Sequence, residues 1–285
     1  MTAPEAVLTA RDVSIEYEVD EPVKAVRNVS LTLHRGEILG LAGESGCGKT
    51  TLAYGLNRLL KAPALMTGGE ITFHDRSGTD IDVTGLKDDQ LRAFRWDKIS
   101  MVFQGAMNSL NPVISVRAQI FDIFDTHRPG MSKHDKTERA EELLRLVGVD
   151  PRRLTSFPHE LSGGMRQRVM IAMALALDPQ VMIMDEPTTA LDVVVQRGII
   201  REIMRLRERL GFAVIFITHD LPMLIEISDR IAVMLQGEIV EQGTAEEIYR
   251  TPQHEYTKTL LSSFPSLRGE RGGFVRSGAK AEAVR

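Results

Sequence analysis

The first part of the chain holds two segments in which apolar and polar residues alternate. Residues 7–18 and 23–33 show the period of two that half-buried β-strands require, and Asp20, Glu21 and Pro22 supply a turn between them. We therefore expect an antiparallel pair of strands, with a further strand at residues 70–73.

Short apolar runs without alternation predict strands that are buried on both faces. They occur at residues 37–42, 99–103, 181–184 and 212–217, and a hairpin is expected at 230–235 and 238–242. Helices are expected at residues 50–60, 88–96, 116–124, 135–147, 162–177, 194–210 and 221–228, and loops at 61–67 and 105–112. Buried strands that alternate with helices predict an α/β fold in which helices cover both faces of a parallel sheet.

Composition narrows the class of protein. The 285 residues are 43% hydrophobic and 26% charged, as in ordinary globular proteins, and the formal charge of −4 argues against nucleic acid as a partner. The single cysteine excludes a disulfide framework and any zinc or iron–sulfur site built from cysteines of this sequence. We expect no signal peptide and no membrane-spanning segment, so a function at a membrane would need other chains to cross it.

Residues 43–50 match the phosphate-binding pattern G-x-x-x-x-G-K-[ST] and lie between an expected strand and an expected helix. The glycines allow a tight backbone turn whose N–H groups, with the helix dipole, attract phosphate. Lys49 is expected to reach the β- and γ-phosphates and the Thr50 hydroxyl to ligate Mg²⁺. The expected nucleotide-binding residues here are Gly43, Ser45, Gly46, Cys47, Gly48, Lys49, Thr50 and Thr51.

Four buried strands lead to candidate site residues at their carboxyl ends. Gly43, Gln104, Asp185 and His219 each follow such a strand, and ligands of open α/β sheets bind at these ends. Paired carboxylates beside a phosphate loop suit metal binding and water activation. We expect Asp185 to hold Mg²⁺ and Glu186 to take the proton from the attacking water.

The segment 161–167 resembles the signature of the ATP-binding cassette (ABC) ATPases and reads Leu161-Ser162-Gly163-Gly164-Met165-Arg166-Gln167. The other motifs of that family occur in the same order: the phosphate loop, Gln104, the strand before Glu186, Ala190-Leu191-Asp192 and His219. The resemblance spans about residues 6–265. It implies a P-loop NTPase fold of the ABC type, with a RecA-like parallel-sheet core, an antiparallel β subdomain and a helical subdomain at about 106–165 that carries the signature.

The resemblance also implies roles for individual residues. Tyr17 resembles the aromatic residue that stacks on adenine, His219 the histidine that contacts the γ-phosphate, and Gln104 the glutamine that senses Mg²⁺ and the attacking water. Two subunits of the family pack head to tail, so that the signature of one closes over the ATP of the other. Ser162, Gly163, Gly164 and Asp192 are therefore expected to act on the nucleotide of a partner cassette.

A narrower resemblance points to the oligopeptide, dipeptide and nickel importer group. It rests on residues 101–104 with 108–112, on 161–172 and on 254–261. It implies two transmembrane permease subunits, an extracytoplasmic solute-binding protein and a second ATPase, which is a paralogue or another copy of this chain. It also implies a place at the cytoplasmic face of the cell membrane, an ABC ATPase domain at 1–250 and an importer-type extension at 251–285 with a flexible tail.

Some positions depart from that group. Gly105-Ala106 stands where Asp-Pro is frequent, and Glu255 stands where Pro is usual. Residues 268–285 contain no cysteine, so we expect no iron–sulfur cluster there. Cys47 is either a small residue that fits the loop or a redox-sensitive one; alkylation is expected to block ATP binding.

Three functions stay open from the sequence. The first is an ATPase that energises a membrane importer, for oligopeptides or dipeptides, or alternatively for oligosaccharides or nickel. The second is a soluble ABC ATPase without membrane partners, although the chain shows one cassette and no heptad run. The third is the ATPase of an exporter, which the segment 254–261 disfavours.

Overall fold

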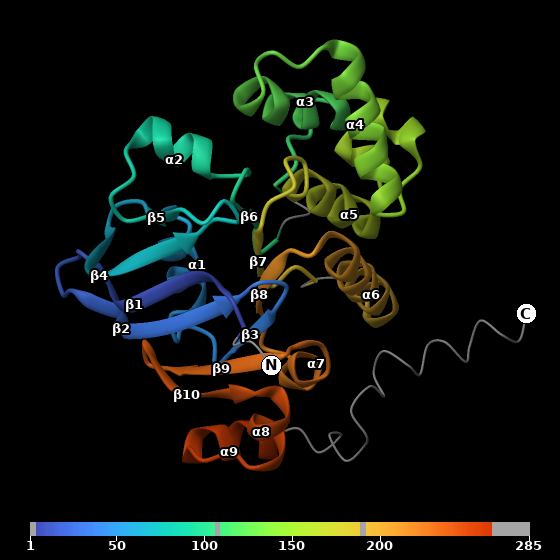
Figure 1. Ribbon diagram of the computed structural model, residues 1–285. Helices are drawn as coiled ribbons and strands as arrows, with labels where there is room; N and C mark the ends of the chain where they lie inside the picture. The colour runs from blue at the N-terminus through green and yellow to red at the C-terminus, as the bar shows by residue number, and fades with distance from the viewer. Residues whose placement is uncertain (1–3, 106–108, 189–191, 264–285) are drawn as a thin grey trace, which may run out of the picture. The chain divides into compact units, whose positions relative to one another are not determined.

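The computed structural model describes residues 4–105, 109–188 and 192–263. The chain divides into two compact units, shown in Figure 1. Unit 1 comprises residues 1–86 and 213–285, and unit 2 comprises residues 87–212. Unit 1 therefore combines the two ends of the chain, and unit 2 is a continuous insertion between them.

Unit 1 contains an antiparallel sheet with the order β2-β1-β4-β5. Its strands are β1 (Ala6–Tyr17), β2 (Val23–His34), β4 (Ala64–His74) and β5 (Asp80–Asp82). The alternation of residues 7–18 and 23–33 correctly predicted the first pair, because it buries one face of each strand; Leu8 and Leu33, for example, face each other across the pair.

The expected loop at 61–67 was wrong from residue 64 onward. Residues 64–67 belong to β4, where Ala64 pairs with Tyr17 and Met66 with Ile15 of β1. Their apolar pattern is weak, so pairing with a distant strand, not local propensity, makes them a strand. The expected helix at 50–60 was also too long, because α1 (Lys49–Leu56) ends before Arg58, whose φ of 52° is left-handed.

In the second sheet, the strands that belong to unit 1 follow the order β10-β9-β3-β8. The strands β3 (Ile38–Ala42) and β8 (Ala213–Ile217) are buried along their whole length and run parallel, as their all-apolar sequences predicted. β3 also runs parallel to β9 (Arg230–Leu235), which forms the expected hairpin with β10 (Glu238–Thr244).

Three further helices belong to unit 1: α7 (Leu221–Ile227), α8 (Ala245–Arg250) and α9 (Glu255–Ser262). The sequence predicted α7 but not α8 and α9. The buried residues of α8 are Ala245 and Ile248, and α9 buries only the polar Thr257, so no apolar stripe marks either helix in the sequence. α8 begins with a capping box between Thr244 and Glu247.

Unit 2 contains a parallel pair, β6 (Ile99–Val102) and β7 (Val181–Asp185), together with helices. The helices are α2 (Asp88–Phe94), α3 (Val116–His127), α4 (Lys133–Leu146), α5 (Gly163–Ala174) and α6 (Val193–Leu210), with short 3₁₀ turns at Pro151–Thr155 and Pro158–Glu160. Each α-helix was predicted, with bounds that differ by a few residues.

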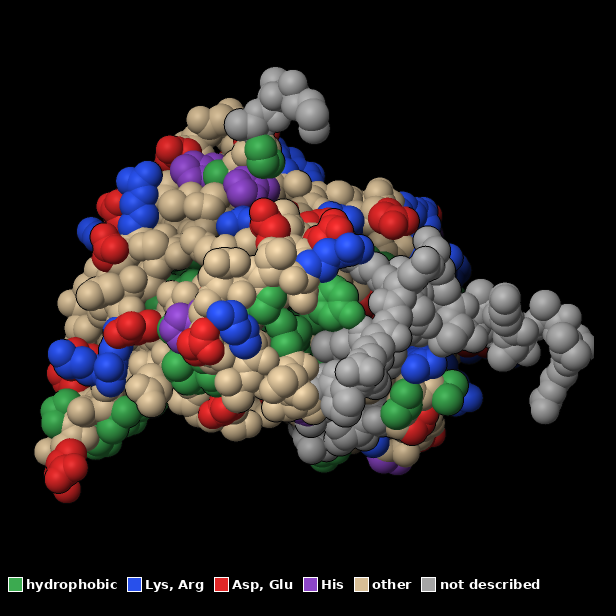
Figure 2. Space-filling model, turned by 90° about the horizontal axis from the view of Figure 1, so that it is seen from below, with side chains coloured by type: hydrophobic (Ala, Val, Ile, Leu, Met, Phe, Trp, Pro, Cys, Tyr) green, Lys and Arg blue, Asp and Glu red, His purple; other side chains and the backbone are tan. Residues whose placement is uncertain are grey.

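The fold class predicted from the sequence is confirmed: parallel strands alternate with helices, and an antiparallel sheet accompanies them. Within the described ranges, no helix combines the length and apolarity that crossing a bilayer requires. On the face shown in Figure 2, acidic and basic side chains of the described residues lie interspersed.

Candidate functional site

The phosphate loop of unit 1 joins β3 to α1 and lies against backbone on two sides. A Cβ on Gly43 would lie 2.2 Å from the carbonyl oxygen of Met234, and a Cβ on Gly48 would lie 2.2 Å from that of Ala25. Gly43 has a φ of 146° and Gly48 a φ of 105°. Glycine is required at both positions because any side chain would collide with a neighbouring strand.

The turn between β9 and β10 supports the loop by hydrogen bonds. The N–H of Gly237 donates to the carbonyl of Cys47 (3.0 Å), and the carbonyl of Gly237 accepts from the N–H of Arg27 in β2 (2.8 Å). The loop is thus held from β2 and β9, in the unit that carries it, and its backbone conformation is fixed by segments far away in the sequence.

Lys49 and the loop backbone provide the positive charge that a phosphate group needs. The Lys49 side chain is 7% exposed, and its ammonium donates to the carbonyls of Gly43 and Glu44, both at 2.7 Å. Ser45 and Gly46 are exposed. An ammonium group beside a glycine-rich turn at a helix N-terminus has the chemistry of an anion site, which supports the phosphate-binding prediction.

Unit 1 brings two more of the predicted residues to the same region. The Tyr17 hydroxyl, at the end of β1, lies 3.0 Å from the hydroxyl oxygen of Thr51, the residue after the loop. Ile217 of β8 pairs with Leu41 of β3, and Gly43 and His219 follow these residues by two positions each. His219 and the loop therefore leave the sheet at the same edge.

In unit 2, a second parallel pair of strands brings Gln104 and Glu186 together in the same way. Val102 of β6 pairs with Met184 of β7, and the two candidate residues again follow by two positions. The Gln104 side-chain amide donates to the Glu186 carboxylate at 2.9 Å. Asp185, the last residue of β7, has no exposed surface. Register thus brings together side chains that are 82 residues apart.

Glu186 adopts a conformation that its sequence does not reveal. Its φ is 44°, in the left-handed region that non-glycine residues rarely occupy. Such a backbone costs about 1–3 kcal/mol and is found mainly at functional sites. Six other non-glycine residues of the described ranges also have a positive φ, so this conformation fits a functional role for Glu186 without assigning one.

The residues predicted to hold Mg²⁺ are Thr50, Gln104 and Asp185. Their oxygen atoms are a hydroxyl, a side-chain amide and a carboxylate, which are the hard ligands that Mg²⁺ prefers. The donor set fits the ion, which is usually held in proteins by a few such groups together with substrate phosphates. Across the described residues, no group of three or more His, Cys, Asp or Glu side chains could hold a metal.

The remaining motif residues lie at helix N-termini in unit 2. Ser162 caps α5 by accepting the N–H of Met165 (3.3 Å), and Asp192 caps α6 by accepting the N–H groups of Val194 (3.1 Å) and Val195 (2.9 Å). Gly163 and Gly164 begin α5, and a Cβ on Gly164 would lie 2.8 Å from Val195. Ala190 and Leu191 lie outside the described residues.

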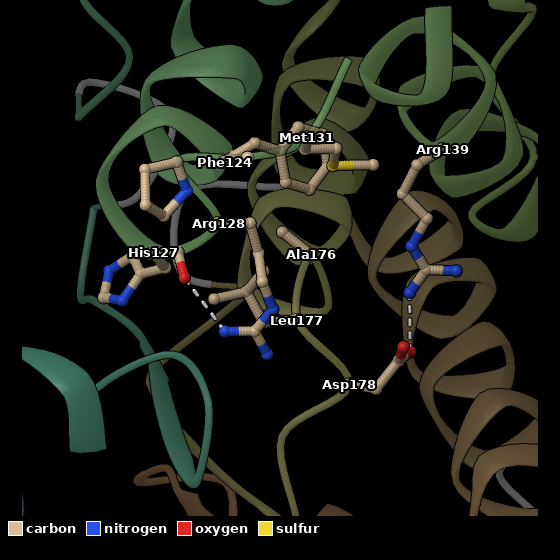
Figure 3. A pocket seen from close by; sticks show the side chains of 10 residues that line it. Phe124, His127, Arg128, Met131, Arg139, Ala176, Leu177 and Asp178 are labelled. Carbon is tan, nitrogen blue, oxygen red and sulfur yellow. Dashed lines mark hydrogen bonds and ion pairs between the residues drawn. The ribbon is translucent and has the colours of Figure 1, made fainter.

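Unit 2 also contains a cavity of about 630 Å³, shown in Figure 3. Phe124, Met131 and Leu177 form part of its apolar lining. Arg139 and Asp178, which both line it, form an ion pair at 2.6 Å. Burial, together with the nearby Arg128, lowers the pKa of His127. None of the motif residues lines this cavity. The two arginines that line it are paired with carboxylates of the protein, Arg128 with Asp97 and Arg139 with Asp178.

Two family models match the chain. The model described as "ABC transporter" matches residues 26–189, and the model described as "Oligopeptide/dipeptide transporter, C-terminal region" matches residues 240–284. The second match includes α8 and α9, which the sequence pattern did not predict as helices.

Individual proteins are similar along most of the chain. The "Probable peptide ABC transporter ATP-binding protein y4tR" of Sinorhizobium fredii is 45% identical over 269 residues, which are 93% of this chain and 78% of that protein. The "Glutathione import ATP-binding protein GsiA" of Salmonella typhimurium is 44% identical over 270 residues, and this chain spans only 43% of its length. A solved dimeric structure of the ATP-binding cassette MJ0796, bound to ADP and Pi, has a TM-score of 0.72 and 31% identity, and the match covers 84% of this chain and 98% of that one.

Proposed function

We propose that this chain, which belongs to the ABC transporter family, is the ATP-hydrolysing subunit of a membrane importer for peptides. One observation carries the proposal: the ABC family match at 26–189 is followed in the same chain by the match to the C-terminal region of oligopeptide and dipeptide transporters at 240–284. The first match concerns the ATPase and the second concerns the class of solute.

In this proposal the loop residues Gly43 to Thr51 bind the phosphates of ATP, and Tyr17 stacks on the adenine. The buried ammonium of Lys49 and the loop N–H groups support this assignment. Thr50, Gln104 and Asp185 would hold Mg²⁺, which would neutralise phosphate charge while the γ-phosphoryl group passes to water and ADP is released.

Glu186 serves as the general base that takes the proton from the attacking water. The side-chain amide of Gln104 donates a hydrogen bond to the Glu186 carboxylate. This bond supports the proposal that both residues act on the attacking water. His219 contacts the γ-phosphate. The N-terminus of α5, with Ser162, Gly163 and Gly164, and also Asp192, act on the ATP bound to a second cassette; the dimeric form of MJ0796 supports a paired arrangement.

The partners follow from the importer function. They are two transmembrane permease subunits, an extracytoplasmic solute-binding protein and a second ATPase, either a paralogue or a second copy of this chain. The chain works at the cytoplasmic face of the cell membrane. Its ABC domain covers 1–250, its helical subdomain at about 106–165 receives the permease, and residues 251–285 form the importer-type extension.

The Glu186→Gln variant tests both the chemistry and the assembly. It keeps the size of the side chain and removes the base, so ATP binding is retained while hydrolysis falls by about 100-fold or more. Glu208→Gln, at an exposed position of α6, is the matched control and keeps the wild-type rate. Wild-type turnover by the Glu186→Gln variant in the assembled complex would refute the assignment of the base.

Tagged Glu186→Gln chain is then recovered from native membranes in the presence of Mg-ATP, and co-purified proteins are identified by mass spectrometry. Two multi-span proteins, an ATPase and a solute-binding protein are expected, and the binding protein should bind dipeptides or oligopeptides in calorimetry. Recovery of soluble partners or ribosomes alone would overturn the importer and leave the ATPase activity.

A further inference from the structure

The C-terminal helix α9 contacts the phosphate loop directly. The hydroxyl oxygen of Tyr256, in the first turn of α9, accepts the backbone N–H of Glu44 at 3.0 Å. The two residues are 212 positions apart and both belong to unit 1. A side chain from the C-terminal region therefore fixes the second residue of the loop that is proposed to bind ATP.

The position of Tyr256 is itself fixed by Glu241 of β10. The Glu241 carboxylate accepts the N–H groups of Gln253 (2.7 Å) and His254 (3.0 Å), the two residues that precede α9. Burial raises the pKa of Glu241, but these bonds, together with the Thr257 hydroxyl and the His254 side chain, hold the pKa below its ordinary value. His254 in turn caps α9 by accepting the N–H of Tyr256 at its Nδ1 atom (3.1 Å).

Both ends of this connection lead to the same sheet. β10 pairs with β9, and β9 pairs with β3, the strand that runs into the phosphate loop. Thr257, next to Tyr256, has no exposed surface, so the first turns of α9 pack against the rest of unit 1 at this residue. The Tyr256 hydroxyl is consequently held at a defined distance from the start of the loop.

On its other side, the Glu44 residue contacts the group proposed to bind phosphate. Its carbonyl accepts the Lys49 ammonium at 2.7 Å and the N–H of Cys47 at 3.3 Å. The bond from Tyr256 restrains the N–H of Glu44, and rotation of that residue would move the carbonyl that Lys49 contacts. The connection therefore runs from α9 through Glu44 to Lys49.

We infer that Tyr256 is a positioning residue for ATP: by holding the N–H of Glu44, the docked helix α9 keeps the phosphate loop in the conformation that binds nucleotide. The inference rests on the proposed ATP-binding function and adds a role for the C-terminal region in it. By linkage, bound nucleotide stabilises the docked form of α9 to the same extent that docking strengthens nucleotide binding.

The test compares Tyr256→Phe with the wild-type full-length chain, using Mg²⁺ and the non-hydrolysable analogue AMP-PNP in calorimetry. Loss of one hydrogen bond predicts a dissociation constant about two- to tenfold higher. The backbone amide of Glu44 should also exchange its hydrogen faster in Tyr256→Phe, and AMP-PNP should slow exchange in α9 of the wild type only.

Thr259→Val is the matched control, because it removes an exposed hydroxyl from the same helix. That hydroxyl donates to the Glu255 carbonyl within α9, so nucleotide affinity and exchange at Glu44 stay at wild-type values. Glu241→Ala provides a second test of the inference. It releases the segment before α9 and should weaken AMP-PNP binding to an extent similar to that of Tyr256→Phe. Combining it with Tyr256→Phe should weaken binding little further, because both changes break one connection.

The outcomes separate the inference from the proposed function. If the wild-type chain binds no AMP-PNP, the proposed function fails and the inference fails with it. If the wild type binds and Tyr256→Phe binds equally well, with unchanged exchange at Glu44, only the inference is overturned. A lower melting temperature of Tyr256→Phe without a change in affinity would show a purely structural role and would overturn it as well.

Discussion

Replacing Gly48 by alanine is expected to destabilise the chain far more than the same change at Gly46 in the same loop. Both glycines have left-handed backbones, with φ of 105° and 80° respectively. Only Gly48 lies against another strand: its added Cβ would be 2.2 Å from the Ala25 carbonyl oxygen and 2.9 Å from the Met234 methyl group. An added Cβ at Gly46 meets nothing within 4 Å.

The magnitudes follow from these contacts. Left-handed strain costs each variant about 1–3 kcal/mol. A comfortable contact of a carbon atom is about 3.5 Å, so Gly48→Ala must also displace the loop or β2 by about 1 Å. β2 cannot yield easily, because Arg27 binds the β9–β10 turn. Overpacking of this kind costs about 1–3 kcal/mol more, which is the predicted difference between the two variants.

Thermal unfolding of the nucleotide-free chain, followed by circular dichroism, measures this difference. At about 2–4 °C per kcal/mol for a chain of this size, Gly48→Ala should melt about 2–12 °C below Gly46→Ala. Nucleotide is left out because a methyl group on the exposed Gly46 would also meet bound phosphate. Equal melting temperatures would refute the conclusion that the strands behind the loop require glycine at position 48.

Two further predictions concern the caps and the single cysteine. Ser162→Ala removes the N-cap of α5 and Ser132→Ala removes that of α4, so each should lower the free energy of unfolding by about 1 kcal/mol in urea denaturation. Only Ser162→Ala should also reduce ATP hydrolysis by the assembled transporter. Equal hydrolysis by the two variants would contradict a role of α5 in the reaction. Cys47 is 6% exposed, so iodoacetamide should modify it slowly, and Mg-ATP should slow the reaction further. Its sulfur lies 3.5 Å from the Lys49 ammonium, so complete modification should displace that group and abolish ATP binding. Full binding after complete modification would exclude the role of Cys47 in the loop.

The predicted and missed elements show which secondary structure a local pattern of residues can reveal. The strands β3 and β8, and β7 up to Met184, were predicted because a strand that buries both faces requires apolar residues along its length. Residues 64–67 were missed because their strand exists only through pairing with β1. The helices α8 and α9 were missed because α8 buries two apolar residues and α9 buries only the polar Thr257, so neither shows an apolar stripe.

The chemistry of the candidate site was predictable from the sequence for a related reason. A phosphate loop needs glycines and a lysine at fixed spacing, and carboxylates at the end of a buried strand stand out from the apolar residues before them. These requirements are local, because one short segment supplies all the groups. The sequence therefore determined the fold class, the residues of the phosphate loop and the candidate acids Asp185 and Glu186.

The tertiary structure alone decided which distant groups meet. The bond between Gln104 and Glu186 depends on the register of β6 and β7, and the left-handed backbone of Glu186 leaves no trace in its residue type. The bond from Glu44 to Tyr256 depends on how β10 and Glu241 place α9. Such contacts are set by strand register and packing between segments remote in sequence, and no local pattern of residues encodes them.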